Sequence, residues 1–215
     1  MTEQDFNIWE GVYENWDLAP ADDDVFASDI WIDKISRQAL RVFESYHSPD
    51  ELLLNTSIHE NALPLASAML SLNDLEPLRV LDFGGGMGTG YLYLKTSLCA
   101  QKLIEYHIVE GEAICQRGKE LFSSHPNLYF HQTLPSLPDP VHIIHLGSSL
   151  QYIENWNGLI GSFTSLKPRY LILTDVLAGD IKSFVTIQKF HGKKIHAHFK
   201  NLKEFLSAVE QLGFH

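Results

Sequence analysis

Cysteine is scarce in this chain of 215 residues, which has only Cys99 and Cys115. So few thiols do not form a disulfide framework, and their spacing matches no metal-binding pair. We therefore expect ordinary thiols in a reducing compartment. Three late histidines, His191, His196 and His198, have no carboxylate or cysteine at a familiar ligand spacing. We expect them to form an exposed basic segment, and we expect no metal site.

Positive charge and long apolar runs are scarce as well. Lysine and arginine number 16 against 27 aspartates and glutamates, so the formal net charge is -11 at pH 7. Nucleic-acid binding depends largely on cationic contacts to phosphates, so this balance argues against a nucleic-acid partner. No apolar run approaches the roughly 18 residues of a membrane span, and the acidic start MTEQDFNIWE has no signal-peptide core. We expect a cytoplasmic protein with no membrane span.

The apolar residues that are present change their spacing near residue 78. Before it, they recur at spacings of three and four and predict an amphipathic helix that ends before Ser48-Pro49. These positions are Trp31, Ile35, Ala39, Val42, Phe43 and Tyr46. A second helix is expected within residues 58–72, beginning near 61–63, because Pro64 fits a first helical turn. Residues 1–77 are thus expected to form an N-terminal helical arm or lid.

From Leu78 onward, short apolar strands alternate with stretches that fit helices. The expected strands are 78–83, 104–110, 128–132, 141–147 and 170–176, and the expected helices are 112–122 and 156–166. Such crossovers are what parallel strands need, because a tight hairpin cannot return the chain in the same direction. The alternation predicts an α/β fold with a doubly wound, mostly parallel sheet, over one domain of residues 78–215.

The last part of the chain is less regular. FVTIQKF, residues 184–190, is rich in β-formers, and residues 202–212 predict a final helix before Gly213. A doubly wound sheet often continues with a further strand at this point. Either FVTIQKF fills an edge position of that sheet, or the sequence stops before a final strand.

The most unusual local feature is a glycine-rich loop after the first expected strand. Five of the seven residues 84–90 are glycine, and in an open α/β sheet ligands bind at the carboxyl ends of the strands. The loop is not a P-loop, because Tyr91 stands where the motif requires lysine. The dinucleotide pattern also fails, because Thr89 or Tyr91 stands at its third glycine. A small ligand other than a nucleotide diphosphate is therefore expected here.

The loop resembles the first motif of the class I S-adenosylmethionine-dependent methyltransferases. The resemblance lies in Asp82-x-Gly84-x-Gly86-x-Gly88, preceded by Val80-Leu81. It implies that the loop passes against the amino-acid part of the cofactor and that Asp82 takes part in binding its ammonium group. The cofactor-binding residues implied in this part of the chain are Asp82, Gly84, Gly85, Gly86, Gly88, Glu110 and Gly111.

The same resemblance assigns roles further along the chain. Glu110, at the end of the next strand, would accept hydrogen bonds from both ribose hydroxyls of the cofactor. Thr133 and Leu134 would lie near the adenine, and Gly147 and Ser148 near the methionine end.

The protein has to position the methyl acceptor and, where needed, remove its proton. Asp175 and His59 are our expected catalytic residues, and His145 and Tyr13 are further candidates for the base.

Five segments resemble one family of uncharacterised bacterial methyltransferases. They are WEGVYENW, VLDFGGGMG, IVEGE, SSLQYI and VTIQ. That family has an acid followed by arginine after the fifth strand, where this sequence has Asp175-Val176. The resemblance implies methyl transfer to an oxygen or nitrogen atom of a small molecule or saccharide. Two alternatives stay open: a non-catalytic S-adenosylmethionine-binding protein of the same fold, or a nicotinamide-dependent oxidoreductase.

Overall fold

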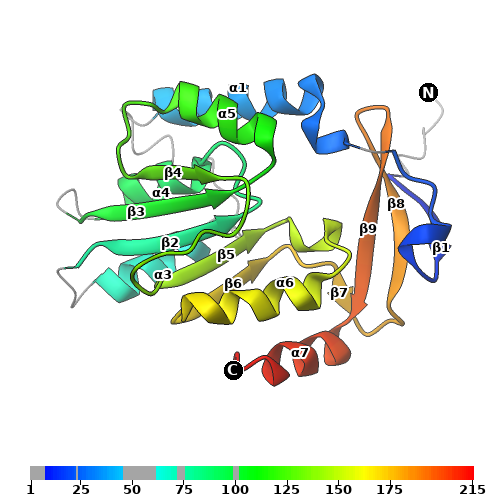
Figure 1. Ribbon diagram of the computed structural model, residues 1–215. Helices are drawn as coiled ribbons and strands as arrows, with labels where there is room; N and C mark the ends of the chain where they lie inside the picture. Colours follow the sequence, from blue (N-terminus) through cyan, green and yellow to red (C-terminus); the bar gives the residue numbers. More distant parts are fainter. Residues whose placement is uncertain (1–7, 23, 46–61, 72–75, 99–101) are drawn as a thin grey trace. The chain divides into compact units, whose positions relative to one another are not determined.

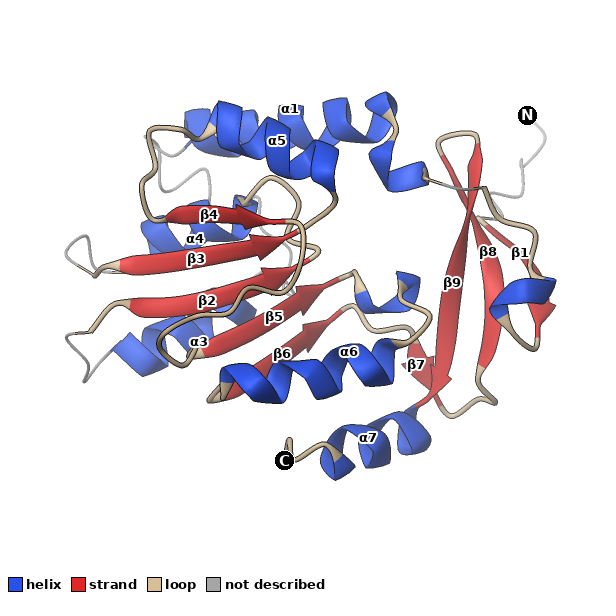
Figure 2. Ribbon diagram, viewed as in Figure 1, coloured by secondary structure: helices blue, strands red, loops and turns tan. Residues whose placement is uncertain are grey.

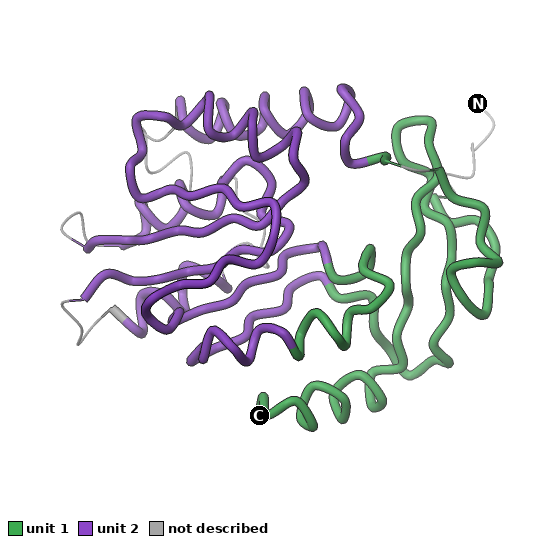
Figure 3. The backbone as a smooth tube through the Cα atoms, viewed as in Figure 1, with its two compact units in different colours: residues 1–25, 150–161, 176–215 green, residues 26–149, 162–175 purple. Residues whose placement is uncertain are grey.

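A computed structural model describes residues 8–22, 24–45, 62–71, 76–98 and 102–215. Its contacts divide the chain into two compact units (Figure 3). The larger unit consists of Phe26–Ser149 and Ser162–Asp175, and the smaller unit of Met1–Val25, Leu150–Gly161 and Val176–His215. In this division, the N-terminal segment pairs with a late strand within the smaller unit, and α1 (Asp29–Ser45) belongs to the larger unit. The boundary expected at residue 78 stays a prediction.

The larger unit is built on a five-stranded sheet in the order β4-β3-β2-β5-β6, with every pairing parallel. Its strands are β2 (Leu78–Phe83), β3 (Ile104–Val109), β4 (Leu128–His131), β5 (Ile143–Gly147) and β6 (Tyr170–Thr174). Figure 2 shows the five arrows pointing the same way. The predicted strands and the parallel sheet are confirmed, so all five carboxyl ends lie along one edge.

The helices follow the predicted pattern. The α-helices in the described residues are α1 (Asp29–Ser45), α3 (Ala62–Ser71), α4 (Thr89–Ser97), α5 (Glu112–Leu121), α6 (Trp156–Phe163) and α7 (Leu202–Gln211). The short 3-10 helices are η1 (Trp16–Leu18), η2 (Val25–Ala27), η4 (Leu150–Tyr152) and η5 (Thr164–Leu166). Pro64 lies in the first turn of α3, where its missing N–H leaves no hydrogen bond unmade.

One face of the parallel sheet carries the main core of the larger unit. Ile35, Ala39 and Val42 form the buried stripe of α1, at the spacing expected for an amphipathic helix. The same cluster contains Val80 from β2 and Tyr106 from β3, together with residues of α3, α4 and α5. Figure 1 shows where these helices and strands lie in the larger unit. Helix α1 is therefore part of this core, and its function as a lid stays a prediction.

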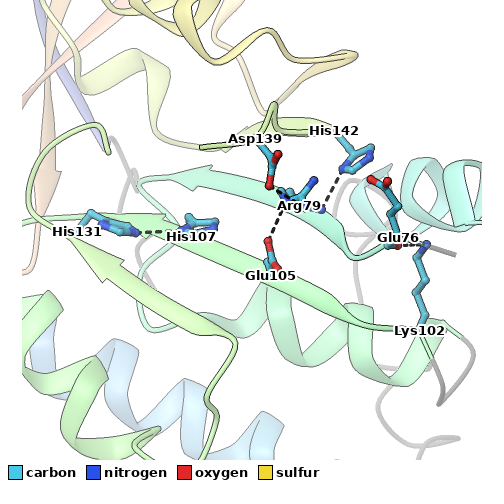
Figure 4. A network of polar contacts seen from close by, with 8 residues as sticks. All are labelled: Glu76, Arg79, Lys102, Glu105, His107, His131, Asp139 and His142. Atoms are coloured by element: carbon cyan, nitrogen blue, oxygen red, sulfur yellow. Dashed lines mark hydrogen bonds and ion pairs between the residues drawn. The ribbon is translucent and has the colours of Figure 1, made fainter. Parts of the chain in front are cut away.

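The opposite face of the sheet carries a polar network around Arg79 (Figure 4). The guanidinium donates to Glu105 at 2.9 Å and pairs with Asp139 at 3.2 Å. The backbone N–H of Arg79 donates to Nδ1 of His142 at 3.1 Å. These contacts tie β2, β3 and the segment before β5 together at the end of the sheet opposite the glycine loop.

Beside this network, His107 and His131 face each other with their ring nitrogens 3.0 Å apart. Burial, with the charges of His131 and Arg79 acting in the same direction, lowers the pKa of His107 to about 4. Tyr129 stacks on the His107 ring with centroids 4.8 Å apart. His107 is thus neutral near pH 7, and the two histidines fill this part of the sheet surface.

The smaller unit contains a second sheet, in the order β1-β8-β9-β7. Its strands are β1 (Trp9–Tyr13), β7 (Ala178–Gly179), β8 (Phe184–Phe190) and β9 (Lys193–Asn201). Strands β8 and β9 form an antiparallel hairpin through His191 and Gly192, which both have positive φ, at 49° and 79°. Positive φ at both central residues is typical of the tight turns that match strand twist. Of the two alternatives for residues 184–190, the one that places them at an edge of the parallel sheet is therefore wrong.

The late histidines do not form an exposed segment, which corrects a second expectation. His191 is exposed in the turn, but the His196 ring packs on Trp16 with centroids 4.6 Å apart, and its Nε2 lies 2.9 Å from the carbonyl oxygen of Ala19. Burial is the main cause that lowers the pKa of His198 to about 4. The alternation of β9 turns His196 and His198 toward the apolar side of the smaller sheet.

Candidate functional site

A pocket of about 210 Å³ lies at the carboxyl ends of β2, β5 and β6 in the larger unit. Two of its lining residues come from the first turn of α3, and the others come from the strand ends, the glycine loop and the start of α4. The lining residues are Leu63, Pro64, Asp82, Gly84, Gly85, Thr89, Gly90, Tyr93, His145, Gly147, Ser148, Thr174 and Asp175. This is the position at which open α/β sheets bind their ligands.

Asp82 is buried at the base of this pocket, with 3% of its surface exposed. Its Oδ2 accepts a hydrogen bond from the hydroxyl of Tyr106 at 2.6 Å, and its Oδ1 lies 2.8 Å from Nδ1 of His145. Burial and the Asp82 carboxylate raise the pKa of Tyr106 well above its usual value, so the hydroxyl keeps its proton and donates. Asp82 and His145 are register partners on adjacent parallel strands, which brings their side chains to one face.

Two of the loop glycines leave room for this buried network. A Cβ atom on Gly85 would collide with Oδ2 of Asp82, and one on Gly90 would collide with the Tyr106 hydroxyl. Such collisions require the structure to shift, because buried groups are packed closely. These two positions are therefore glycine because of Asp82 and Tyr106, a reason that the sequence motif alone does not reveal.

The Glu110 carboxylate is tied to the same loop. Its Oε1 accepts from the backbone N–H of Gly86 at 3.0 Å, and its Oε2 from the N–H of Gly111 at 3.1 Å. Burial raises the pKa of Glu110, while these two backbone hydrogen bonds oppose the shift. A carboxylate has about four acceptor sites, so Glu110 keeps capacity for further donors such as a pair of hydroxyls.

The far side of the pocket is formed by the ends of β5 and β6. The Ser148 hydroxyl donates to Oδ2 of Asp175 at 2.5 Å, and Nε2 of His145 lies 3.5 Å from the Thr174 hydroxyl. Ser148 and Asp175 both have positive φ, at 54° and 56°. Non-glycine residues with this backbone are uncommon and cluster at functional sites.

The structure brings together most of the residues predicted as a site. Asp82, Gly84, Gly85, Gly147, Ser148 and Asp175 line the pocket. Gly86 and Gly111 contact Glu110, and Gly88 is the N-cap residue of α4. Thr133 and Leu134 follow β4 and are not among the pocket-lining residues. His59 lies outside the described residues.

Several pocket residues were not predicted from the sequence. Tyr93 and Thr89 come from α4, and Leu63 and Pro64 from α3. His145 was expected only as one of several bases, although its place at the end of the strand beside β2 is a signal for closeness to Asp82. The other unpredicted residues line the pocket because elements that are far apart in the sequence come together there.

The charges around the pocket are mostly negative. Asp82 and Asp175 contribute carboxylates, and no lysine or arginine is found among the lining residues within the described ranges. Of the lining side chains in the described part of the chain, only that of His145 can carry a positive charge. Such a lining suits a ligand with positive groups and disfavours a diphosphate. Among the described residues, no group of three or more metal-ligating side chains is present, and no helix is long and apolar enough to cross a membrane.

No protein-family model and no curated protein matches this sequence. Solved structures do match the backbone. One is a candidate S-adenosylmethionine-dependent methyltransferase from Listeria monocytogenes, with a TM-score of 0.50 and 13% identity over 72% of this chain and 84% of that one. The chain has a Rossmann-like methyltransferase fold.

Two further structures match this chain at lower similarity. The N-terminal domain of EvdMO1, with SAH bound, has a TM-score of 0.49 and 17% identity over 77% of this chain and 75% of that one. A candidate methyltransferase in complex with the Haloferax volcanii activator Trm112 has a TM-score of 0.47 and 15% identity, over 85% of this chain and 75% of that one.

Proposed function

We propose that this chain is an enzyme that transfers a methyl group from S-adenosylmethionine to an oxygen or nitrogen atom of a small molecule or saccharide. The observation that carries the proposal is the pair of hydrogen bonds from Gly86 and Gly111 to Glu110. The hydrogen bond from Gly86 connects the glycine loop directly to Glu110, which follows β3. The methyltransferase fold and the sequence motif around Asp82 and Gly84 support the same reading.

The residues of the site fit this cofactor. Glu110 has acceptor capacity left after its two backbone bonds, as binding a ribose through two hydroxyls requires. The acidic lining suits the ammonium and sulfonium charges of S-adenosylmethionine. Asp82 lies at the base of the pocket, and we assign the loop backbone from Gly84 to Gly86 to the amino-acid part of the cofactor.

The cofactor supplies a methyl group on a sulfonium that is already activated for transfer. The protein therefore has to orient the acceptor and exclude competing water. Positioning alone is worth about 7 kcal/mol or more of the barrier, against roughly 3–5 kcal/mol for a general base. We assign the base to Asp175, whose carboxylate lines the pocket and is oriented by the Ser148 hydroxyl. His59 stays a second proposal for this role.

The nicotinamide alternative fits the pocket less well. A dinucleotide brings a diphosphate, and the described lining holds Asp82 and Asp175 with no lysine or arginine to neutralise it. The glycine spacing of the dinucleotide motif is also missing from the loop. A protein that binds S-adenosylmethionine without transferring its methyl group is the other alternative.

Two measurements test the proposal. Calorimetry of the purified chain with S-adenosylmethionine, S-adenosylhomocysteine and NADH should show binding of the first two only. Incubation with methyl-labelled S-adenosylmethionine and a cell extract should then move label into a small-molecule or saccharide fraction, and omission of the chain is the control. Tight NADH binding without affinity for the sulfonium compound would refute the proposal, and binding without label transfer would favour the non-catalytic alternative.

A further inference from the structure

The Asp82 carboxylate is occupied by the protein itself. One oxygen accepts from the Tyr106 hydroxyl and the other pairs with His145, and only 3% of the residue is exposed. The Gly85 backbone lies so close above it that a Cβ atom there would collide with its Oδ2. A direct bond from Asp82 to a ligand ammonium group would have to compete with these buried contacts.

His145 is placed to face a ligand instead. Its Nδ1 lies 2.8 Å from the Asp82 carboxylate, which has no proton to donate when ionised, so Nδ1 carries the hydrogen of this bond. The second ring nitrogen, Nε2, lies 3.5 Å from the Thr174 hydroxyl. His145 and Thr174 both line the pocket. A Cβ atom on Gly147 would come within 2.9 Å of the His145 ring, so Gly147 keeps the space beside this ring open.

We propose that Nε2 of His145 binds the carboxylate of the cofactor's amino-acid part, and that Asp82 is a positioning residue that holds the ring. The inference rests on the proposed function, because it takes S-adenosylmethionine as the ligand. The carboxylate is the one anionic group of S-adenosylmethionine, and the proposal gives it a binding partner in the pocket.

The charges of the lining support this assignment. A ligand carboxylate that enters beside Asp82 and Asp175 meets two groups of its own sign, and the lining residues that the structure describes include no lysine or arginine to balance them. A hydrogen bond from Nε2 to the ligand requires a hydrogen on Nε2 as well as on Nδ1, and a ring in that form would supply a positive donor beside the buried Asp82 carboxylate. The Thr174 hydroxyl, which is within reach of Nε2, supplies a second donor to the same ligand group.

The test compares ligands that differ in the carboxylate. The affinities of S-adenosylmethionine and decarboxylated S-adenosylmethionine are measured by calorimetry on the wild-type chain and its variants. The quantity of interest is the dissociation constant of the decarboxylated compound divided by that of S-adenosylmethionine, because this ratio isolates the carboxylate contact. His145→Ala should lower this ratio about 10- to 100-fold, as expected for a lost hydrogen bond to a charged group. The affinity for the decarboxylated compound should change less than about 3-fold.

Further variants separate this contact from a general structural effect. His145→Gln offers a neutral donor near the position of Nε2 and should restore part of the ratio. Asp82→Asn should lower the ratio less than His145→Ala, because the ring stays but loses its charged partner. His191→Ala removes an exposed histidine of the smaller unit and should leave the ratio unchanged. Thermal melting shows that each variant is folded.

The outcomes distinguish this inference from the proposed function. A wild-type chain that binds both compounds, with the same ratio in folded His145→Ala protein, would overturn the inference and leave the proposed function standing. Equal loss of affinity for both compounds would overturn it as well, since His145 would then act without regard to the carboxylate. A wild-type chain that binds neither compound would refute the proposed function, and this inference with it.

Discussion

The hydroxyl of Tyr106 lies 2.6 Å from the buried Oδ2 of Asp82 and joins the middle of β3 to the end of β2. Both residues are almost completely buried, so neither polar group has water as an alternative partner. A buried polar group that loses its partner destabilises the folded state by about 1–3 kcal/mol. This hydrogen bond is therefore expected to hold the pocket base in place.

Tyr106→Phe should lower the free energy of unfolding by about 1–3 kcal/mol, because Oδ2 of Asp82 loses its donor. Urea unfolding monitored by fluorescence measures the change. Tyr129→Phe is the matched control, since Tyr129 lies on the next strand and is 39% exposed. Equal stability of the Tyr106→Phe variant and the wild type would show that this hydrogen bond contributes nothing.

Gly90→Ala should destabilise the chain because its Cβ atom collides with the Tyr106 hydroxyl. In the Tyr106→Phe background that oxygen is gone, so the added effect of Gly90→Ala should be smaller by about 1 kcal/mol or more. A double-mutant cycle by urea unfolding measures this coupling. Gly111→Ala is the control, because nothing lies within 4 Å of a Cβ atom there. Strictly additive effects of the two substitutions would contradict the steric explanation.

Lys200 gives a prediction about stability and pH in the smaller unit. Burial lowers its pKa to about 8, while a lysine in the unfolded chain titrates near 10.4. Between these values the unfolded chain binds more protons, so the free energy of unfolding should rise with pH through this window. Lys200→Met should remove this rise and stabilise the protein at pH 7 by about 1–3 kcal/mol.

Thermal melts at pH 7, 8 and 9.5 test this behaviour of Lys200, with Lys203→Met as an exposed control. An identical pH dependence in the wild type and the Lys200→Met variant would show that Lys200 keeps its proton throughout the range.

Asp175→Asn tests the proposed base. The amide still accepts the Ser148 hydrogen bond but cannot take a proton, so label transfer should fall about 10²- to 10⁴-fold. Affinity for S-adenosylmethionine should change much less. Transfer from methyl-labelled cofactor in a cell extract measures the first effect and calorimetry the second. A variant that transfers label at the wild-type rate would remove Asp175 from the chemistry.

The parts of the fold that could be predicted are those that local patterns determine. The parallel strands are short apolar runs, and the α1 stripe of Ile35, Ala39 and Val42 repeats with the helical period. Glu110 was expected to bind the ribose on the strength of the family resemblance, and its hydrogen bond with Gly86 of the loop was not predicted. The strands and the apolar stripe of α1 could be predicted because each depends on residues that are close together in the sequence.

The second sheet could not be predicted by the same means. Strand β1 pairs with β8, so Trp9 and Gln188 are register partners although most of the sequence lies between them. No local pattern specifies such a distant partner. The His191-Gly192 turn between two β-rich runs was the available signal for a hairpin. It was missed because the residues after it were interpreted as an exposed basic segment.

The site was predicted in outline but not in its internal contacts. The glycines were explained by a ligand alone, whereas Gly85 and Gly90 also make room for Asp82 and Tyr106. The partnership of Asp82 with His145 depends on the strand order and the register, which place both side chains on one face. A sequence pattern does not carry this information, because the two residues are 63 positions apart.

The central claim is that the glycine loop and Glu110 together hold S-adenosylmethionine. Its most direct test is calorimetric titration of that compound into the wild-type chain and into Glu110→Ala. The account predicts clear binding to the wild type and a loss of about 100-fold in the variant, because two hydrogen bonds to a charged group disappear. Equal affinity of both proteins, with circular dichroism showing that the variant is folded, would contradict it.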